Sequence, residues 1–452
     1  MLDTLQTVLA FVVTLSILVA VHEFGHFWVA RRCGVKVLRF SIGFGKPLIS
    51  WRDRHGTEFA VAGIPLGGYV KMLDEREGEV PPEEAHLAFN RQSPGKRIAI
   101  AAAGPIANFV LAVLVYWLVF MGGTQGVAPL VGEVEKGSLA QQAGLVAGQE
   151  IVSVDGKATP TWEQLSIRLL ERVGETGELS IAAKYPESDL IYESTIVLDG
   201  WMKGVAEPDP IAGLGLELYR PRVEPVISEV VADSAAERAG MQTGDRLVSA
   251  DGEAIEDWMA WVEYVKVRAG TPIELEFERN GQLQRTTITP AGRNTEGDRV
   301  GFVGMAVVPP PPLPEKWLRE YHYGPVEAFI AASQKTVHMS VFTVESIYKM
   351  ITGLLSPKNL SGPITIAKVA GASAEYGLSA WLNLLALLSI SLAVLNLLPV
   401  PVLDGGHIVY GLIELVSGRP VTEKIQMVAN QVGLAMVVCL MVFALYNDVL
   451  RL

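Results

Sequence analysis

His22-Glu23-Phe24-Gly25-His26 follows an apolar stretch, because residues 4–21 contain no charged residue. A stretch of this length predicts a membrane-spanning helix. Histidines at positions i and i+4 of a helix share one face, so both imidazoles can bind one Zn²⁺, and the glutamate between them can act as general base on a water. Ionisable groups within such a helix are costly, so the pattern indicates a function. The alternative is a chance match with histidines that snorkel to the membrane surface.

The composition is typical of a membrane protein with a large soluble part. Hydrophobic residues make up 50% and the mean hydropathy is +0.30, yet 19% of the residues are charged. This mixture favours a few spans with water-exposed domains. The net charge of −12 argues against a nucleic acid partner. Cys33 and Cys439 lie beside or inside apolar stretches and imply no disulfide framework.

Four stretches are long and apolar enough to span a membrane: about 4–30, 98–121, 378–403 and 428–446. Residues 1–21 contain no Lys or Arg, so a cleavable signal peptide is not expected.

Loop charges predict the orientation of these spans. Residues 31–97 hold 12 Lys and Arg, which places this loop in the cytoplasm and residues 122–377 outside. Residues 326–355 are fairly apolar but carry charges, so we expect an interfacial helix there. A fifth span in that place would invert the C-terminal half of the chain. It would then place Asp404, the third candidate metal ligand, on the opposite side of the membrane from His22 and His26.

The external region repeats itself at an offset of 96 residues, from Pro129 (PLVGEVEKGSLAQQAG) and from Pro225 (PVISEVVADSAAERAG). Two tandem copies of one small domain are the natural interpretation. In each copy the sequence predicts a strand, a short helix, a strand and a D-G turn. This order resembles the permuted bacterial PDZ domain. The resemblance implies a peptide-carboxylate loop in each copy. Peptide capture and passive filtering by size stay equally open. The candidate loop residues are Gly213, Leu214, Gly215 and Leu216 in the first copy, and Gly301, Phe302, Val303 and Gly304 in the second.

A third metal ligand is expected from Asn396-Leu-Leu-Pro399-Val-Pro401-Val-Leu-Asp404-Gly405-Gly406. A catalytic zinc usually takes three protein ligands and one water. The two prolines predict a broken helix, and such backbone is tolerated at membrane depth only where it is buried or lines a cavity. Asp404 can there meet the two histidines. The alternative is a helix-ending turn with a solvated Asp404.

With both motifs present, the whole chain resembles the site-2 protease family of intramembrane zinc metalloproteases. The resemblance implies that His22, His26 and Asp404 bind Zn²⁺ and that Glu23 moves the proton. It also implies a membrane-reentrant β-hairpin at about 57–72 that pairs with an unwound substrate, whereas the alternative is a peripheral cytoplasmic hairpin. The residues implied to contact substrate are Asn396, Pro399, Pro401, Gly67, Gly68 and Tyr69. Five other histidines are interpreted as ordinary surface or interface residues: His55, His86, His322, His338 and His407.

The family resemblance implies an endopeptidase of the bacterial inner membrane. Its substrates would be single-span proteins, among them an anti-sigma factor already trimmed by a first protease in an envelope stress response, and remnant signal peptides. The PDZ pair would screen out substrates with large outer domains. Two other classes remain in view: a membrane receptor or scaffold without protease activity, and a metal transporter. Intact Glu23 argues against the receptor, and only four spans argue against the transporter.

The predicted fold is therefore a polytopic α-helical membrane protein with four transmembrane helices, a cytoplasmic reentrant β-hairpin and two tandem PDZ domains on the periplasmic side. The predicted division is 1–31 (helix 1), 32–97 (cytoplasmic loop), 98–121 (helix 2), 127–220 and 221–308 (PDZ domains), 309–377 (Pro-rich linker and interfacial helices), 378–404 (helix 3) and 428–446 (helix 4).

Overall fold

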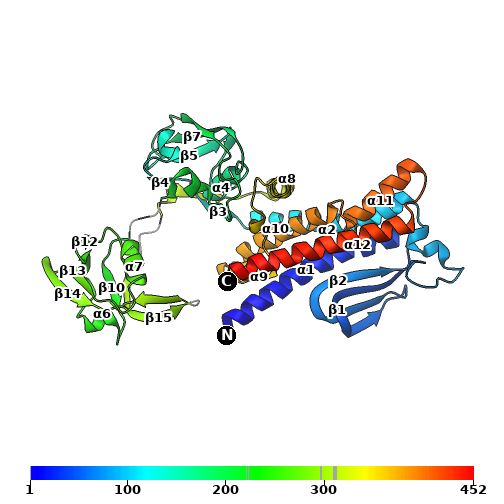
Figure 1. Ribbon diagram of the computed structural model, residues 1–452, viewed down its shortest axis with the longest axis horizontal. Helices are drawn as coiled ribbons and strands as arrows, with labels where there is room; N and C mark the ends of the chain where they lie inside the picture. Colours follow the sequence, from blue (N-terminus) through cyan, green and yellow to red (C-terminus); the bar gives the residue numbers. More distant parts are fainter. Residues whose placement is uncertain (1, 220, 222, 296–297, 309–312, 452) are drawn as a thin grey trace.

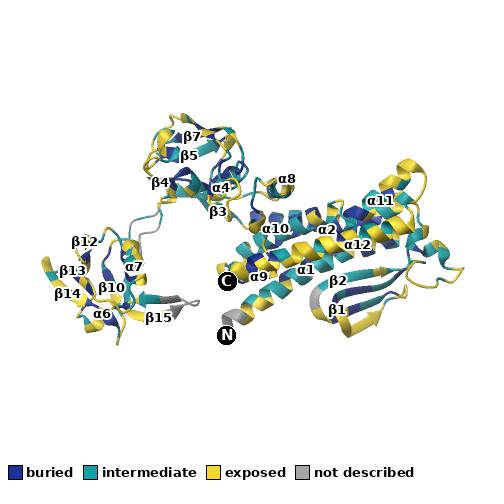
Figure 2. Ribbon diagram, in the orientation of Figure 1, coloured by how far each residue is buried: buried dark blue, intermediate teal, exposed yellow. Residues whose placement is uncertain are grey.

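The computed structural model describes residues 2–219, 221, 223–295, 298–308 and 313–451. Within them, four helices are long and apolar enough to cross a membrane, as the sequence predicts. They are α1 (Leu2–Arg32), α2 (Pro94–Met121), α10 (Leu378–Leu397) and α12 (Glu423–Leu450). Figure 1 shows them side by side, with both chain termini at one end of the bundle. Exposed residues cover much of their outer faces in Figure 2, as expected for helices that face lipid.

Helix α2 is the centre of the bundle, because it packs against α1, α10 and two further helices, α8 (Pro325–Ile351) and α11 (Asp404–Ser417). Its buried side chains at the end near the termini form one core with α8 and α10. Small residues bring α1 and α2 close together. A Cβ on Gly25 would lie 2.3 Å from the carbonyl oxygen of Ala103 and 2.8 Å from Cβ of Ala107.

A long hairpin packs against α1 at the other end of the bundle (Figure 1). Strand β1 (Val37–Arg52) pairs antiparallel with β2 (Glu58–Met72). The stretch 57–72, predicted as a whole hairpin, instead lies almost entirely in β2. Its first half, residues 58–61, pairs with both 39–42 and 49–52 of β1, and its second half, residues 68–72, pairs with 37–42. Aromatic packing of Phe27 on Phe40 and Phe59 fixes the hairpin on α1.

Two β units follow α2. In the first, the sheet order is β6-β5-β7-β8, and β4 pairs separately with β9. A buried apolar cluster fills this unit. Its elements are β4 (Val131–Val134), α3 (Leu139–Gln142), β5 (Glu150–Val154), β6 (Lys157–Ala158), α4 (Trp162–Leu170), β7 (Gly177–Lys184), β8 (Tyr192–Leu198), α5 (Pro210–Leu214) and β9 (Leu216–Leu218).

The second β unit has the equivalent sheet order β12-β11-β13-β14, and β10 pairs with β17. Ser138 and Ser234, 96 residues apart, cap the first helix of each unit in the same way. The PDZ assignment of the two units stays a prediction. The elements here are β10 (Ile227–Val230), α6 (Ala235–Arg238), β11 (Arg246–Ala250), β12 (Glu253–Ala254), α7 (Trp258–Lys266), β13 (Ile273–Arg279), β14 (Gln282–Ile288), β15 (Ala291–Thr295), β16 (Asp298–Phe302) and β17 (Met305–Val307).

The chain returns to the bundle through β18 (Leu318–Tyr321), which pairs with β3 (Thr124–Val127) next to α2. Helix α8 then lies across the end of the bundle, since Figure 1 shows it nearly end-on while the spanning helices run lengthwise. The buried ammonium of Lys349 fastens it to the first β unit, 2.8 Å from a carboxylate oxygen of Glu175. Whether α8 lies at a membrane surface stays a prediction.

The third spanning helix ends earlier than its predicted limit at residue 404. Helix α10 stops at Leu397, and a loop leads to α11, which begins at Asp404. The residue before a proline disfavours the helical conformation, so Leu398 is extended ahead of Pro399. Helix α12, in contrast, extends beyond the predicted 428–446 at both ends.

Helix α9 (Pro363–Tyr376) receives an N-terminal cap from a distant helix. The carboxylate of Asp448, on α12, is 1% exposed and accepts hydrogen bonds from the amides of Gly362, Ile364 and Thr365 at 2.8–3.2 Å. It also accepts one from the Thr365 hydroxyl. This single side chain therefore ties the end of α12 to α9.

Asp448→Leu should destabilise the protein. We expect a loss of about 1–3 kcal/mol for each donor left buried without an acceptor. Thermal unfolding of the purified chain in detergent measures the effect. Asp448→Asn keeps one acceptor oxygen and should fall in between, and exposed Glu375→Gln on α9 should unfold like the wild type. An unchanged midpoint for Asp448→Leu would contradict the capping role.

Candidate metal centre and active site

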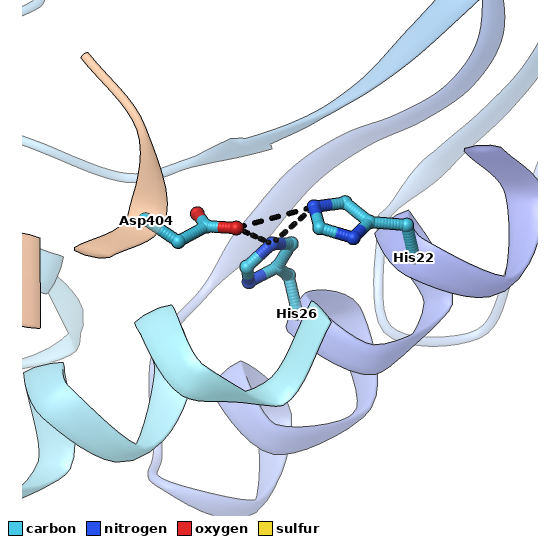
Figure 3. Close-up of side chains that lie close together, drawn as sticks. All are labelled: His22, His26 and Asp404. Carbon is cyan, nitrogen blue, oxygen red and sulfur yellow. Dashed lines mark hydrogen bonds and ion pairs between the residues drawn. The ribbon is translucent and has the colours of Figure 1, made fainter. Parts of the chain in front are cut away.

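Three side chains meet at one point between α1 and α11 (Figure 3). The Nε2 atoms of His22 and His26 lie 3.2 Å apart. Oδ2 of Asp404 lies 3.2 Å from Nε2 of His22 and 3.4 Å from Nε2 of His26. The structure thus brings together the three residues that the sequence proposes as metal ligands, although 378 positions separate His26 from Asp404.

The spacing of these three atoms fits a zinc ion. Four ligands placed tetrahedrally about 2.0–2.1 Å from zinc are separated from one another by about 3.3 Å. The observed edges of 3.2, 3.2 and 3.4 Å match three corners of such a tetrahedron. Oδ2 of Asp404 is buried and makes no well-aligned hydrogen bond within the described residues, which leaves its lone pairs free. The donor set and the geometry both suit Zn²⁺.

Helix α2 shapes the space around the histidines. A Cβ on Gly104 would lie 2.2 Å from Nε2 of His26 and 2.8 Å from Nε2 of His22, so only glycine fits. The Ile100 carbonyl, one turn earlier, lies 2.7 Å from Nδ1 of His26 and can accept its proton. That hydrogen bond leaves Nε2 of His26 free to bind metal.

The loop before α11 positions Asp404. Glycine is needed at both following positions, because a Cβ on Gly405 would lie 2.1 Å from the Leu398 carbonyl oxygen and one on Gly406 would lie 2.6 Å from that of Val400. Val402 has a φ of +88°, which is unusual for a β-branched residue and costs about 1–3 kcal/mol. The loop therefore turns sharply enough for the carboxylate of Asp404, the first residue of α11, to face α1.

An ion pair holds α11 against α2. The guanidinium of Arg97 lies 2.5 Å from the carboxylate of Glu414, and both side chains are mostly buried. Gly411 packs on Ile98 in the same contact, where a Cβ would lie 2.5 Å from Cγ1. These contacts lock the helix that carries Asp404 onto the helix that supports the histidines.

A cavity of about 430 Å³ opens beside the three ligands. Glu23 lines it, together with the predicted substrate residues Asn396 and Tyr69. A Cβ on Gly68 would lie 3.3 Å from Cγ of Glu23, so β2 runs directly past this carboxylate.

The other predicted substrate residues lie elsewhere. Pro399 and Pro401 are in the loop before Asp404 and are not among the residues that line the cavity, and neither is Gly67. A Cβ on Gly67 would meet the ring of Phe44 at 2.4 Å, so this glycine allows close packing within the hairpin.

Sequence reasoning missed several residues of the site. His407, interpreted as an ordinary histidine, lines the cavity one turn after Asp404. Asp74 and Arg76, which form an ion pair, also line it, and Arg76 reaches the Gln426 side chain at 3.4 Å. The hydrogen bond to Asp74 raises the pKa of the Arg76 guanidinium. The i, i+3 spacing of His407 from Asp404 was the one available signal.

The two candidate carboxylate loops occupy equivalent places in the β units. A Cβ on Gly215 would lie 2.1 Å from Cβ of Ser138, and one on Gly304 would lie 2.3 Å from Cβ of Ser234. Both glycines also have positive φ. Close packing and backbone conformation therefore account for these glycines, and carboxylate binding stays a prediction.

Comparison with known proteins adds the family. The model of peptidase family M50 matches residues 10–440. The chain belongs to peptidase family M50, the site-2 proteases. It is 46% identical to the regulator of sigma-E protease RseP of Salmonella typhimurium strain 14028s and 44% identical to that of Escherichia coli K12, each over the full length of both chains.

Other relatives agree with this family. A protein of Vibrio cholerae named putative zinc metalloprotease is 42% identical, again over both full chains. Among solved structures, the PDZ domain of an SdrC-like protein from Listeria monocytogenes matches 20% of this chain and 93% of its own length at 16% identity, with a TM-score of 0.17 that is too low to bear on the fold. The family and these names support a metalloprotease.

Gly104→Ala should weaken metal binding strongly, because its methyl group would displace both imidazoles. We expect zinc affinity to fall by at least about 10–100-fold, the scale on which disturbed ligand support weakens metal sites. Metal content after purification and competition with a chelating dye measure this. Gly95→Ala in the same helix is the matched control, since its Cβ would meet nothing within 4 Å. Equal zinc binding by both variants would contradict the proposed geometry.

Proposed function

We propose that this chain is a zinc endopeptidase that cuts single-span membrane proteins within or near their transmembrane segment. The observation that carries the proposal is the triangle of His22, His26 and Asp404 with the carboxylate of Glu23 in the same cavity. Membership of peptidase family M50 supports it.

Each residue of the site has a chemical role in this proposal. A bound zinc supplies Lewis acidity and lowers the pKa of a water to near neutral. Glu23 takes the proton of the attacking water and then gives it to the leaving amine. The carboxamide of Asn396 lies in the same cavity and can hold the main chain of the substrate next to the scissile bond.

The hairpin offers a way to open the substrate helix. A transmembrane helix satisfies all its own amides and carbonyls, so it must unwind before a water can reach a peptide bond. In the second half of β2, residues 68–72 pair with β1 on one side only, within the described residues. A substrate strand added to its other edge would find replacement hydrogen bonds. Because β2 runs past Glu23 at Gly68, that strand would pass the catalytic carboxylate.

Charge distribution supports a bacterial inner-membrane location with the hairpin in the cytoplasm and the β units in the periplasm. The full-length relatives carry the name of a regulator of sigma-E protease. We therefore propose an anti-sigma factor, after a first cut outside the membrane, as a substrate of this chain, along with remnant signal peptides. The first β unit, fastened to α8, would hinder substrates that keep a large outer domain.

Glu23→Gln should lower the cleavage rate by about 10²–10⁴-fold, because the amide cannot accept the proton. Cleavage of a purified single-span substrate fragment in detergent measures this, with and without a zinc chelator. Exposed Glu375→Gln, on α9 far from the cavity, is the matched control and should cleave at the wild-type rate.

The same assay separates the rival classes. A receptor or scaffold would bind such fragments but leave them intact. Cleavage that survives both Glu23→Gln and chelation would contradict the proposed chemistry. Absence of cleavage by a zinc-loaded wild-type chain with several trimmed substrates would favour the receptor.

Single cysteines test the orientation. In a background without the two native cysteines, a membrane-impermeant maleimide should label Glu193→Cys in spheroplasts, because this exposed residue belongs to the first β unit. Gly78→Cys, exposed in the loop after β2, should react only after lysis. The reverse pattern would overturn the proposed topology.

A further inference from the structure

Helix α2 turns a buried carboxamide toward one of the histidines. Asn108 is fully buried, and its Nδ2 lies 3.2 Å from Nδ1 of His22. Gly104 lies one turn before it, so both residues share the helix face that contacts α1. The Asn108 side chain therefore lies directly behind the imidazole whose Nε2 faces Asp404.

This carboxamide has no evident structural use. Its Oδ1 is buried and has no hydrogen-bond partner within the described part of the chain, so its contact with His22 is the one hydrogen bond of the side chain recorded there. A buried polar group that is only half satisfied costs free energy. A leucine would fill the same place in an apolar helix without that cost. The role of this amide must therefore lie in its hydrogen bond to His22.

The requirement comes from the imidazole tautomer. A histidine that offers the Nε2 lone pair to a metal carries its proton on Nδ1, and that proton needs an acceptor. His26 finds one in the Ile100 carbonyl, at 2.7 Å from the same helix α2. His22 has Asn108 in the corresponding place, two turns further along α2.

A carboxamide can serve both tautomers of His22. With Nδ2 toward the ring, Nδ1 accepts and the ring proton is on Nε2. Rotation by 180° about the terminal side-chain bond brings Oδ1 to the same position, because the two ends of the amide have nearly the same shape. Oδ1 then accepts from the Nδ1 proton, and Nε2 is free to bind metal.

The backbone at Asn108 is fixed, so this exchange needs only the side chain to turn. The Ser389 hydroxyl of α10 donates a 2.8 Å hydrogen bond to the Asn108 carbonyl oxygen, and both residues are fully buried. This contact joins the spanning helices behind the site and keeps the carboxamide within reach of the ring.

We propose that Asn108 is a positioning residue that accepts the Nδ1 proton of His22 through Oδ1 and so holds the tautomer that binds metal. The inference rests on the proposed zinc site. Because it acts through His22, it predicts an effect on metal affinity before any substrate is present. Loss of such a partner weakens metal binding by about 10–100-fold.

Zinc affinity of the full-length chain in detergent tests the proposal, measured by competition with a chelating dye. Asn108→Leu keeps the size but removes the acceptor, and we expect about 10–100-fold weaker binding. Asn108→Asp keeps an oxygen at the same place and should bind within a few-fold of the wild type or more tightly. Asn383→Leu on α10 is the matched control, since that half-buried amide bonds only to its own helix at Ser379 within the described residues.

A second measurement separates positioning from packing. Without metal, Asn108→Leu should unfold at or above the wild-type temperature, because an incompletely satisfied polar group has been removed. Added zinc should then raise its midpoint less than that of the wild type. If Asn108→Leu does not fold, Asn108→Ala gives the same comparison of the zinc-induced shifts, although the cavity it leaves should lower its midpoint without metal.

The outcomes distinguish the two proposals. Wild-type zinc affinity in Asn108→Leu or Asn108→Ala would overturn the role of Asn108 while leaving the zinc site intact. Equal losses in Asn108→Asp and Asn108→Leu would also overturn it, since an acceptor alone would not matter. A wild-type chain that binds no zinc would instead remove the metal site on which the inference depends.

Discussion

The close approach of α1 to α2 is the contact on which the rest of the structure depends. It is possible because Gly25 and Gly104 lack side chains where the two helices touch. A bulkier residue at either place would push the helices apart or occupy the ligand positions. With the helices in contact, α2 supplies the Ile100 carbonyl and the Asn108 carboxamide behind the imidazoles. Ionisable groups at this depth are costly, and mutual contacts together with a metal charge can offset that cost.

Different contacts position the carboxylate of Asp404. Pro399 ends α10, the strained Val402 turns the chain, and two glycines let α11 start against the preceding loop. The Arg97–Glu414 ion pair then holds α11 on α2. The strain in this loop is stored where the site needs a fixed Asp404, which fits the tendency of unusual backbone to occur at functional sites.

The parts outside the bundle are arranged around this core from two ends. The hairpin brings a strand edge to Glu23. At the end with the chain termini, buried Lys349 ties α8 to the first β unit and Asp448 ties α12 to α9. Both ties use one charged side chain and several backbone groups, which gives strong and directional contacts away from water. The site and the first β unit are thus linked through α2 and α8.

The sequence by itself determined the local features. Apolar length gave four helices able to span a membrane, the spacing of His22 and His26 placed them on one face, and the 96-residue repeat appears as two units with the same sheet order. The four helices and the shared face follow from apolar length and from helical spacing, which are short-range properties of the chain. The two units follow from the similarity of the two copies. The sequence also proposed Asp404 as the third ligand, and the tertiary structure brings it to the histidines. The tertiary structure alone decided that β1 is the partner of β2 and that His407 and Asn108 lie at the site. Such contacts join residues far apart in the chain, and they depend on how closely helices pack, which no local pattern records.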